Sequence, residues 1–169
     1  MMNFTHGQLP PVASTVRNRS RRGNAMLETA LVIVPFFAII LGIIDLSQAF
    51  FVRTTLQHAV RVGVRYAVTS QTLESMCQDA SIKEIIRRNA MGFLKPDDIE
   101  NKVFIRYYRP DTLAPTVNNW PGNIVEVSIE GYQWQWIAPL WRPTTPMTVL
   151  ARASDRMEGL ASGSTPPCR

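Results

Sequence analysis

The sequence predicts an α+β protein in which one long N-terminal helix packs on a small antiparallel sheet. Three observations predict this class. An uncharged apolar run extends from Thr29 to Ile44, an amphipathic pattern with helical spacing follows it, and alternating strand patterns dominate the last third of the chain. With 169 residues, the chain has the length of one modest domain and an anchor.

The basic charge of the chain is concentrated at its N-terminus. Residues 1–23 contain four arginines and no acid, which leaves 14 Lys or Arg against 13 Asp or Glu in the remainder. The four are Arg17, Arg19, Arg21 and Arg22. We expect residues 1–23 to be an unfolded leader that stays on the cytoplasmic side of a membrane. No basic face with interleaved aromatic residues indicates a nucleic-acid partner.

Residues 24–52 are predicted to form a transmembrane helix. The run from Thr29 to Ile44 would span roughly 24 Å as a helix. Apolar residues on either side lengthen it to the ~30 Å of a bilayer core. Glu28 and Asp45 lie at the two ends of this run. We expect Asp45 to meet the lipid head groups or to pair with a cation of a partner subunit.

The helix is predicted to continue out of the membrane, with residues 53–72 as its extension. Polar residues recur every four positions, at Arg53, Gln57, Arg61 and Arg65. The opposite stripe is small and apolar: Leu56, Ala59, Val60, Gly63 and Ala67. This is amphipathic helical spacing, so we expect the apolar stripe to pack on the domain and the polar stripe to face water.

Residues 73–169 are predicted to form an extracytoplasmic α+β domain. Its first element is a short helix from Asp79 to Met91, which Gly92 and Pro96 are expected to stop. A long loop, residues 110–121, is expected before the main strand. The tail after Glu158 is expected to be disordered apart from Cys168.

The domain is predicted to contain an antiparallel sheet of about three or four strands, and the sequence places three of them. They cover residues 103–108, a run beginning at residue 124, and residues 147–154. In the middle strand the alternation of large and polar residues reverses after Gly131, which predicts a bulge there. The aromatic residues that follow, Tyr132, Trp134 and Trp136, are typical of a sheet core or of membrane-interface anchors.

The chain contains two cysteines, Cys77 and Cys168, and both follow the apolar helix. If that part of the chain is exported, a disulfide between them is the default expectation, with two unpaired thiols as the alternative. By the chain-entropy model, a disulfide that closes a ring of about 90 residues stabilises the folded state by roughly 4–5 kcal/mol.

The most informative pattern is the segment that runs from Arg21-Arg22-Gly23-Asn24 to Glu28 and then directly into the apolar helix. Gly23 has no side chain, so a protease can take the backbone there in an extended form. A carboxylate at the start of a membrane helix costs free energy. Glu28 is therefore expected to have a function. A cut after Gly23 would create a free α-amine on Asn24. That cation could pair with Glu28 of a neighbouring subunit or of its own chain.

These residues resemble the prepilin signal Gly-x-x-x-x-Glu, and residues 20–68 resemble the TadE-like pseudopilins of the tight-adherence (Flp, type IVc) pilus system. The resemblance implies a pilin-like fold and a peptidase cut between Gly23 and Asn24. It also implies that Glu28 is the assembly charge at the fifth mature position. Asn24 would be a polar first residue, where many pilins have Phe or Met. The resemblance therefore does not extend to N-methylation of the new terminus.

By this resemblance the protein is a minor pilin-like subunit that acts in pilus biogenesis. Expected partners are the inner membrane, a prepilin peptidase, other pilin-like subunits and the assembly platform. The expected location is the bacterial inner membrane, with the N-terminus in the cytoplasm and the domain in the periplasm. Two alternatives stay open: an uncleaved single-pass anchor with a periplasmic binding domain, and a signal peptide cut before Phe50.

The sequence offers no pattern for catalysis. No Ser/His/Asp set, phosphate-binding glycine loop or metal-ligand spacing is present. We therefore predict a protein that is not an enzyme, with no metal, no cofactor and no small-molecule substrate.

Overall fold

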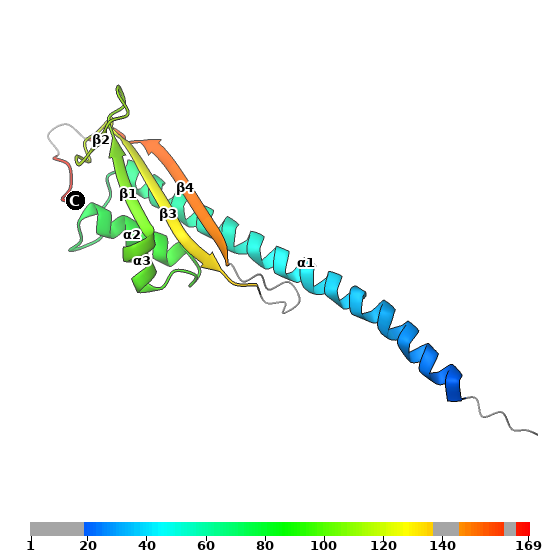
Figure 1. The fold of residues 1–169 in the computed structure, drawn as a ribbon. Helices are drawn as coiled ribbons and strands as arrows, with labels where there is room; N and C mark the ends of the chain where they lie inside the picture. The colour runs from blue at the N-terminus through cyan, green and yellow to red at the C-terminus, as the bar shows by residue number, and fades with distance from the viewer. Residues whose placement is uncertain (1–18, 137–145, 161–164) are drawn as a thin grey trace, which may run out of the picture. The chain divides into compact units, whose positions relative to one another are not determined.

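The computed structural model describes residues 19–136, 146–160 and 165–169, with side chains from Asn24 onward. The elements in chain order are α1 (Arg19–Val68), α2 (Gln78–Asn89), α3 (Pro96–Lys102), β1 (Val103–Tyr108), β2 (Pro115–Thr116), β3 (Ile124–Trp134) and β4 (Met147–Arg156). The chain divides into two units, Met1–Ile39 and Ile40–Arg169. In the second unit the sheet and the two short helices pack against α1 (Figure 1). The predicted α+β class is confirmed.

Helix α1 begins at Arg19, earlier than the expected start at Asn24, so the expected unfolded leader is wrong for its last residues. No proline interrupts the chain between Arg19 and Val34, and arginine is a good helix former. Pro35 lies inside α1 without ending it.

The sheet has four antiparallel strands in the order β2-β1-β3-β4. The predicted strand Val103–Tyr108 is confirmed, and it pairs with β3 from Val103↔Ile129 to Tyr108↔Ile124. The predicted bulge is confirmed as well. The register of β3 on β4 shifts between Ile129 and Tyr132, and Gly131 there has φ 71°. A left-handed backbone of this kind favours glycine.

The core of the domain lies between α1, α2 and the inner face of the sheet. The predicted apolar stripe of α1 is buried, and it meets buried residues of β3: Leu56, Ala59, Val60, Ala67, Val125, Val127 and Ile129. Arg53, Arg61 and Arg65 of the opposite stripe are exposed. The amphipathic spacing therefore predicted correctly which face of α1 packs.

Two elements were not expected from the sequence. The sequence pattern predicts Pro96 only as a stop for the preceding helix, but this residue occupies the first turn of α3. Proline suits that position because its missing N–H has no partner in a helix there. The carboxylate of Asp98 accepts a hydrogen bond from the Lys95 backbone N–H at 3.2 Å, which caps the helix. The other element, β2, is a short strand within the expected loop.

The chain end is ordered by contacts, so the expectation of a disordered tail is wrong for residues 165–169. Cys77 and Cys168 form the predicted disulfide. The carbonyl of Cys168 accepts a hydrogen bond from the Gln78 backbone N–H at 2.7 Å. Arg169 donates from Nε to Oδ2 of Asp79 at 2.8 Å and from Nη1 to the Val117 carbonyl at 2.7 Å. These bonds join the tail to α2 and to the loop after β2.

Gly63 is the point of closest approach between α1 and α2. A Cβ added there would lie 2.6 Å from Cγ1 and 2.9 Å from Cδ1 of Ile86, which is fully buried. Overpacking costs about 1–3 kcal/mol, and alanine regains about 1 kcal/mol over glycine in a helix. Gly63→Ala should therefore lower the free energy of unfolding by about 1 kcal/mol, measured by urea unfolding of the full chain in detergent.

A matched control for this substitution is Gly42→Ala in the same helix. An added Cβ at Gly42 has no atom within 4 Å, so this variant should unfold at the same urea concentration or higher. Combining Gly63→Ala with Ile86→Ala should cost less than the sum of the two, because alanine at position 86 lacks both Cγ1 and Cδ1. If Gly63→Ala unfolds at the same urea concentration as the wild-type protein, the close approach of Gly63 to Ile86 is contradicted.

Candidate functional site

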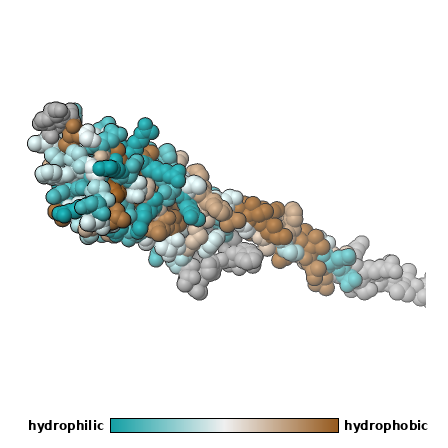
Figure 2. Space-filling model, turned by 90° about the horizontal axis from the view of Figure 1, so that it is seen from above, coloured by the Kyte–Doolittle hydropathy of each residue, from teal (hydrophilic) through white to brown (hydrophobic). Residues whose placement is uncertain are grey.

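The first part of α1 exposes its apolar side chains. Among the described residues, one helix is long and apolar enough to cross a membrane, and none of its most apolar stretch is buried. Figure 2 shows hydrophobic residues along this helix and mostly hydrophilic ones on the domain. The large exposed side chains of the first unit are Met26, Leu27, Leu31, Val32, Ile33, Val34, Phe36, Phe37 and Ile39. An exposed apolar surface of this size is typical of a segment that meets lipid or partner helices.

The three residues of the expected processing signal lie within α1. Gly23 belongs to the helix, and its surroundings are outside the described side chains. Asn24 and Glu28 are both exposed. Residues four apart in a helix lie one above the other on the same face. The Glu28 carboxylate therefore stands about one turn from the residue whose α-amine a cut after Gly23 would expose.

The predicted basic cluster is described only in part. Arg17 lies outside the described residues. Arg19, Arg21 and Arg22 belong to the first turns of α1, for which the backbone is described and the side chains are not. Their role in membrane topology therefore stays a prediction from the sequence.

Asp45 is buried, whereas a place at the lipid head groups would require an exposed side chain. It is only 2% exposed, and Ala49, one turn further along α1, is buried as well. The chain therefore covers this face of α1 directly after the apolar run from Thr29 to Ile44. Exposed apolar side chains continue on other faces of the helix as far as Phe51, and the first exposed cation after them is Arg53.

Three aromatic rings from distant parts of the chain meet where the exposed apolar surface of α1 ends. The rings of Phe51 and Phe93 have centroids 5.9 Å apart, and those of Phe93 and Trp134 lie 6.5 Å apart, both edge-to-face. This geometry is favourable for aromatic pairs. The sequence singled out Trp134 but not its neighbours, because only the fold brings the end of β3 and the turn after α2 to Phe51.

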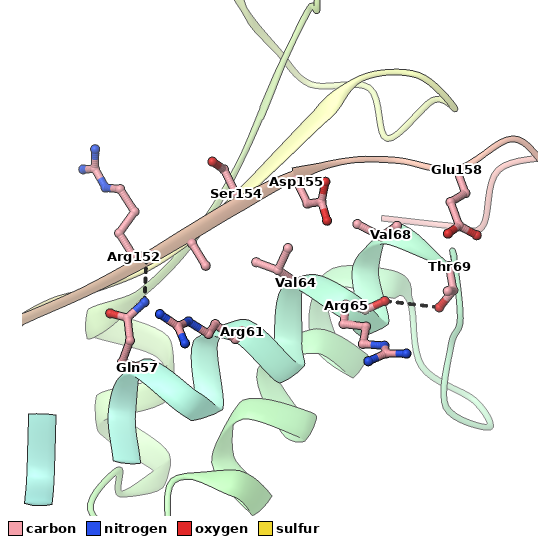
Figure 3. A pocket seen from close by; sticks show the side chains of 11 residues that line it. Gln57, Arg61, Val64, Arg65, Val68, Thr69, Arg152, Ser154, Asp155 and Glu158 are labelled. Atoms are coloured by element: carbon pink, nitrogen blue, oxygen red, sulfur yellow. Dashed lines mark hydrogen bonds between the residues drawn. The ribbon is translucent and has the colours of Figure 1, made fainter. Parts of the chain in front are cut away.

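A groove of about 630 Å³ runs between α1 and β4 (Figure 3). Gln57 crosses it, and its Nε2 donates to the Arg152 carbonyl at 2.8 Å. Arg61 and Arg65 line the α1 side, while the β4 side and the segment after it supply Asp155 and Glu158. The groove is therefore lined by both positive and negative side chains, and neither sign of charge dominates it.

The outer face of the sheet carries a network of ion pairs. Arg106 donates to Oε1 of Glu130 at 2.7 Å and to the Ser128 hydroxyl at 3.1 Å. Arg152 lies 3.7 Å from Glu126 in the same network. The hydrogen bond from Arg106 lowers the pKa of Glu130 below its ordinary value. The four charges balance one another, which is typical of a structural cluster rather than of a binding site.

The polar contacts inside the domain have structural explanations. Tyr107 donates to Oδ1 of Asp79 at 2.8 Å, and the Arg169 guanidinium lies 4.9 Å above the Tyr107 ring. Burial raises the pKa of Tyr107 far above its ordinary value, so this hydroxyl stays protonated at neutral pH. In the described part of the chain, no group of three or more His, Cys, Asp or Glu side chains could hold a metal ion.

The comparisons with known proteins agree with the N-terminal pattern. Residues 23–65 match the TadE family model, described as TadE-like protein. The match begins at the glycine of the expected processing signal and covers the apolar run and the first part of the amphipathic stretch. No curated protein and no solved structure matches the chain.

Proposed function

We propose that this TadE-like chain is a membrane-anchored pseudopilin, a minor pilin-like subunit that acts in biogenesis of the Flp (tight-adherence) type IV pilus. The family match indicates involvement in Tad pilus assembly. The single observation that carries the proposal is that this match begins at Gly23 and extends over a helix whose apolar side chains the chain itself leaves exposed.

The first step of the proposed function is proteolysis. A prepilin peptidase hydrolyses the peptide bond between Gly23 and Asn24, releasing the arginine-containing leader and leaving a protonated amine on Asn24. The leader arginines hold the N-terminus in the cytoplasm before the cut, so the domain faces the periplasm of the bacterial inner membrane.

The second step is lateral assembly. Where the helix enters lipid, little water is available to solvate a charge, so an unpaired Glu28 carboxylate or Asn24 amine is costly there. Pairing the two, within one chain or between neighbours, stabilises helix packing in one register. The other contacts would be the apolar side chains of α1 against pilin-like subunits and the assembly platform. This role needs no catalytic group or cofactor.

Gly23→Ala should block the cut and leave a product about 23 residues longer than the mature protein. The physical reason is steric: the added methyl group would need space in the peptidase where glycine has no side chain. The measurement is gel mobility, together with N-terminal sequencing of the membrane-extracted protein, in which the wild-type chain should begin at Asn24. Gly42→Ala, whose added Cβ meets open space, is the matched control and should be cut normally.

Other results would count against the proposal. A wild-type N-terminus at Phe50 would indicate a signal peptidase and a released domain. A wild-type chain that keeps its leader, with unchanged mobility in Gly23→Ala, would indicate the uncleaved anchor with a periplasmic binding domain.

A further inference from the structure

We propose that the end of the domain around Phe51 is a membrane contact surface that lies in the head-group layer of the phospholipid bilayer. We define this surface, the domain foot, by Phe51, Met91, Phe93, Trp134 and Trp136. The inference rests on the proposed function in one respect, since it requires α1 to cross a membrane. All five residues belong to the same structural unit as residues 40–68 of α1, so their positions relative to that part of the helix are defined.

The exposed side chains of α1 mark where lipid would end. Large exposed hydrophobic residues continue along the helix to Leu46, Phe50 and Phe51. After Phe51 the exposed positions are polar or basic, beginning with Arg53 and Thr54. Phenylalanine followed by arginine at a helix surface is typical of the boundary between hydrocarbon and head groups.

The domain brings further aromatic side chains to this boundary. Phe93 contacts Phe51, and Trp134 contacts Phe93 in turn, so the turn after α2 and the end of β3 lie at the same level of the helix. Trp136, two residues beyond, is half-buried. The Trp134 Nε1 is buried, so this residue would present only the apolar part of its ring to the membrane. Large apolar rings of this kind are enriched at membrane interfaces.

Met91 extends this surface outward. Its side chain is 69% exposed, and its φ is 50°, in the left-handed region that a methionine rarely adopts. An exposed flexible apolar side chain on strained backbone has no role in the core of the domain. Met91 lines a pocket with Thr54 and Thr55, one turn beyond Phe51 on α1. Next to a membrane, its side chain can enter the acyl boundary of the bilayer.

Polar groups suited to lipid phosphates lie directly beside Met91. A pocket of about 410 Å³ is lined by Met91 together with Thr54, Thr55, His58, Arg88 and Asn89. Arg88 donates from Nε to Glu84 at 2.8 Å, and its side chain is more than half exposed. Apolar side chains beside arginine, threonine and amide groups match the chemistry of a phospholipid, whose acyl chains adjoin a phosphate. Such a contact would fix the orientation of the domain on the membrane.

Site-directed spin labelling of the full chain in lipid nanodiscs tests the proposal. The nanodiscs contain phosphatidylethanolamine and phosphatidylglycerol, and the label is attached at Met91→Cys. Leu113→Cys is the matched control, because Leu113 is 65% exposed with φ 53° and follows β1 at the opposite end of the sheet. Ile33→Cys reports on the apolar helix. Cys77 and Cys168 are joined in a disulfide and should not react, which unsubstituted protein verifies.

The label at Met91 should be several-fold less accessible to a water-soluble nickel chelate than the label at Leu113, and more accessible to oxygen. Equal exposure to water at Met91 and Leu113, with Ile33 in lipid, would overturn the foot and leave the membrane anchor intact. All three labels in water would overturn the anchor, and the foot with it.

Tryptophan fluorescence provides a second measurement that leaves Met91 unchanged. A variant that keeps Trp134 as its only tryptophan should lose a large part of its emission in lipids brominated near the head group. A variant that keeps only Trp120, next to the far end of β3, should lose little. Equal quenching in the two variants would contradict the proposal.

Discussion

Cells that carry Glu28→Gln should make far fewer pili than wild-type cells, although the variant protein is cut and folded as usual. Glutamine has almost the same shape as glutamate but no charge, so the Asn24 amine would lose its proposed partner. Removing one member of a buried ion pair costs about 3–5 kcal/mol. At 1.4 kcal/mol for each factor of ten, the association of subunits would weaken by more than about a hundredfold.

The measurement is a count of pili on cells in which the variant replaces the wild-type protein. N-terminal sequencing must show that the variant begins at Asn24, so that a failure to assemble is separated from a failure to be processed. Glu74→Gln removes an exposed charge from the connection between α1 and α2 and is the matched control. Normal pilus numbers in Glu28→Gln would remove the electrostatic part of the proposed function and leave the anchor.

The parts of this fold that the sequence predicts are those with a regular period. The four-residue spacing of Arg53, Gln57, Arg61 and Arg65 predicts the polar side of α1, because one helical face repeats at about that interval. The three arginines are exposed. Alternation along β3 identified its buried side for the same kind of reason, and Gly131 marked the reversal. These patterns are local, and the packing of the domain agrees with them.

The parts that the sequence does not predict depend on contacts between distant segments. The tail after Glu158 looks disordered by composition, yet the Pro167 carbonyl accepts a hydrogen bond from the buried Asn119 at 2.9 Å. Asp45 is buried although its position next to the apolar run predicts exposure. The domain foot likewise exists only because Phe93 and Trp134 meet Phe51, and no spacing in the sequence encodes that meeting.

Replacing both cysteines by serine should destabilise the domain by about 4–5 kcal/mol, by the chain-entropy model for a ring of this size. The bond joins Cys77 to Cys168 across a separation of 91 residues, and the ring includes α2, α3 and the whole sheet. Domains have total stabilities of only about 5–15 kcal/mol. The variant should therefore unfold at a much lower urea concentration than wild type and become more sensitive to added protease.

The disulfide also holds the chain end where its hydrogen bonds form, so the two effects must be separated. Arg169→Ala keeps the bond but removes the contacts of Arg169 with Asp79 and the Val117 carbonyl. Because these groups are partly exposed, their loss should cost only about 1 kcal/mol. Wild-type protein treated with a reductant should behave like the double serine variant. If the double serine variant instead unfolds at the same urea concentration as Arg169→Ala, the hydrogen bonds of the tail, and not the covalent ring, stabilise the domain.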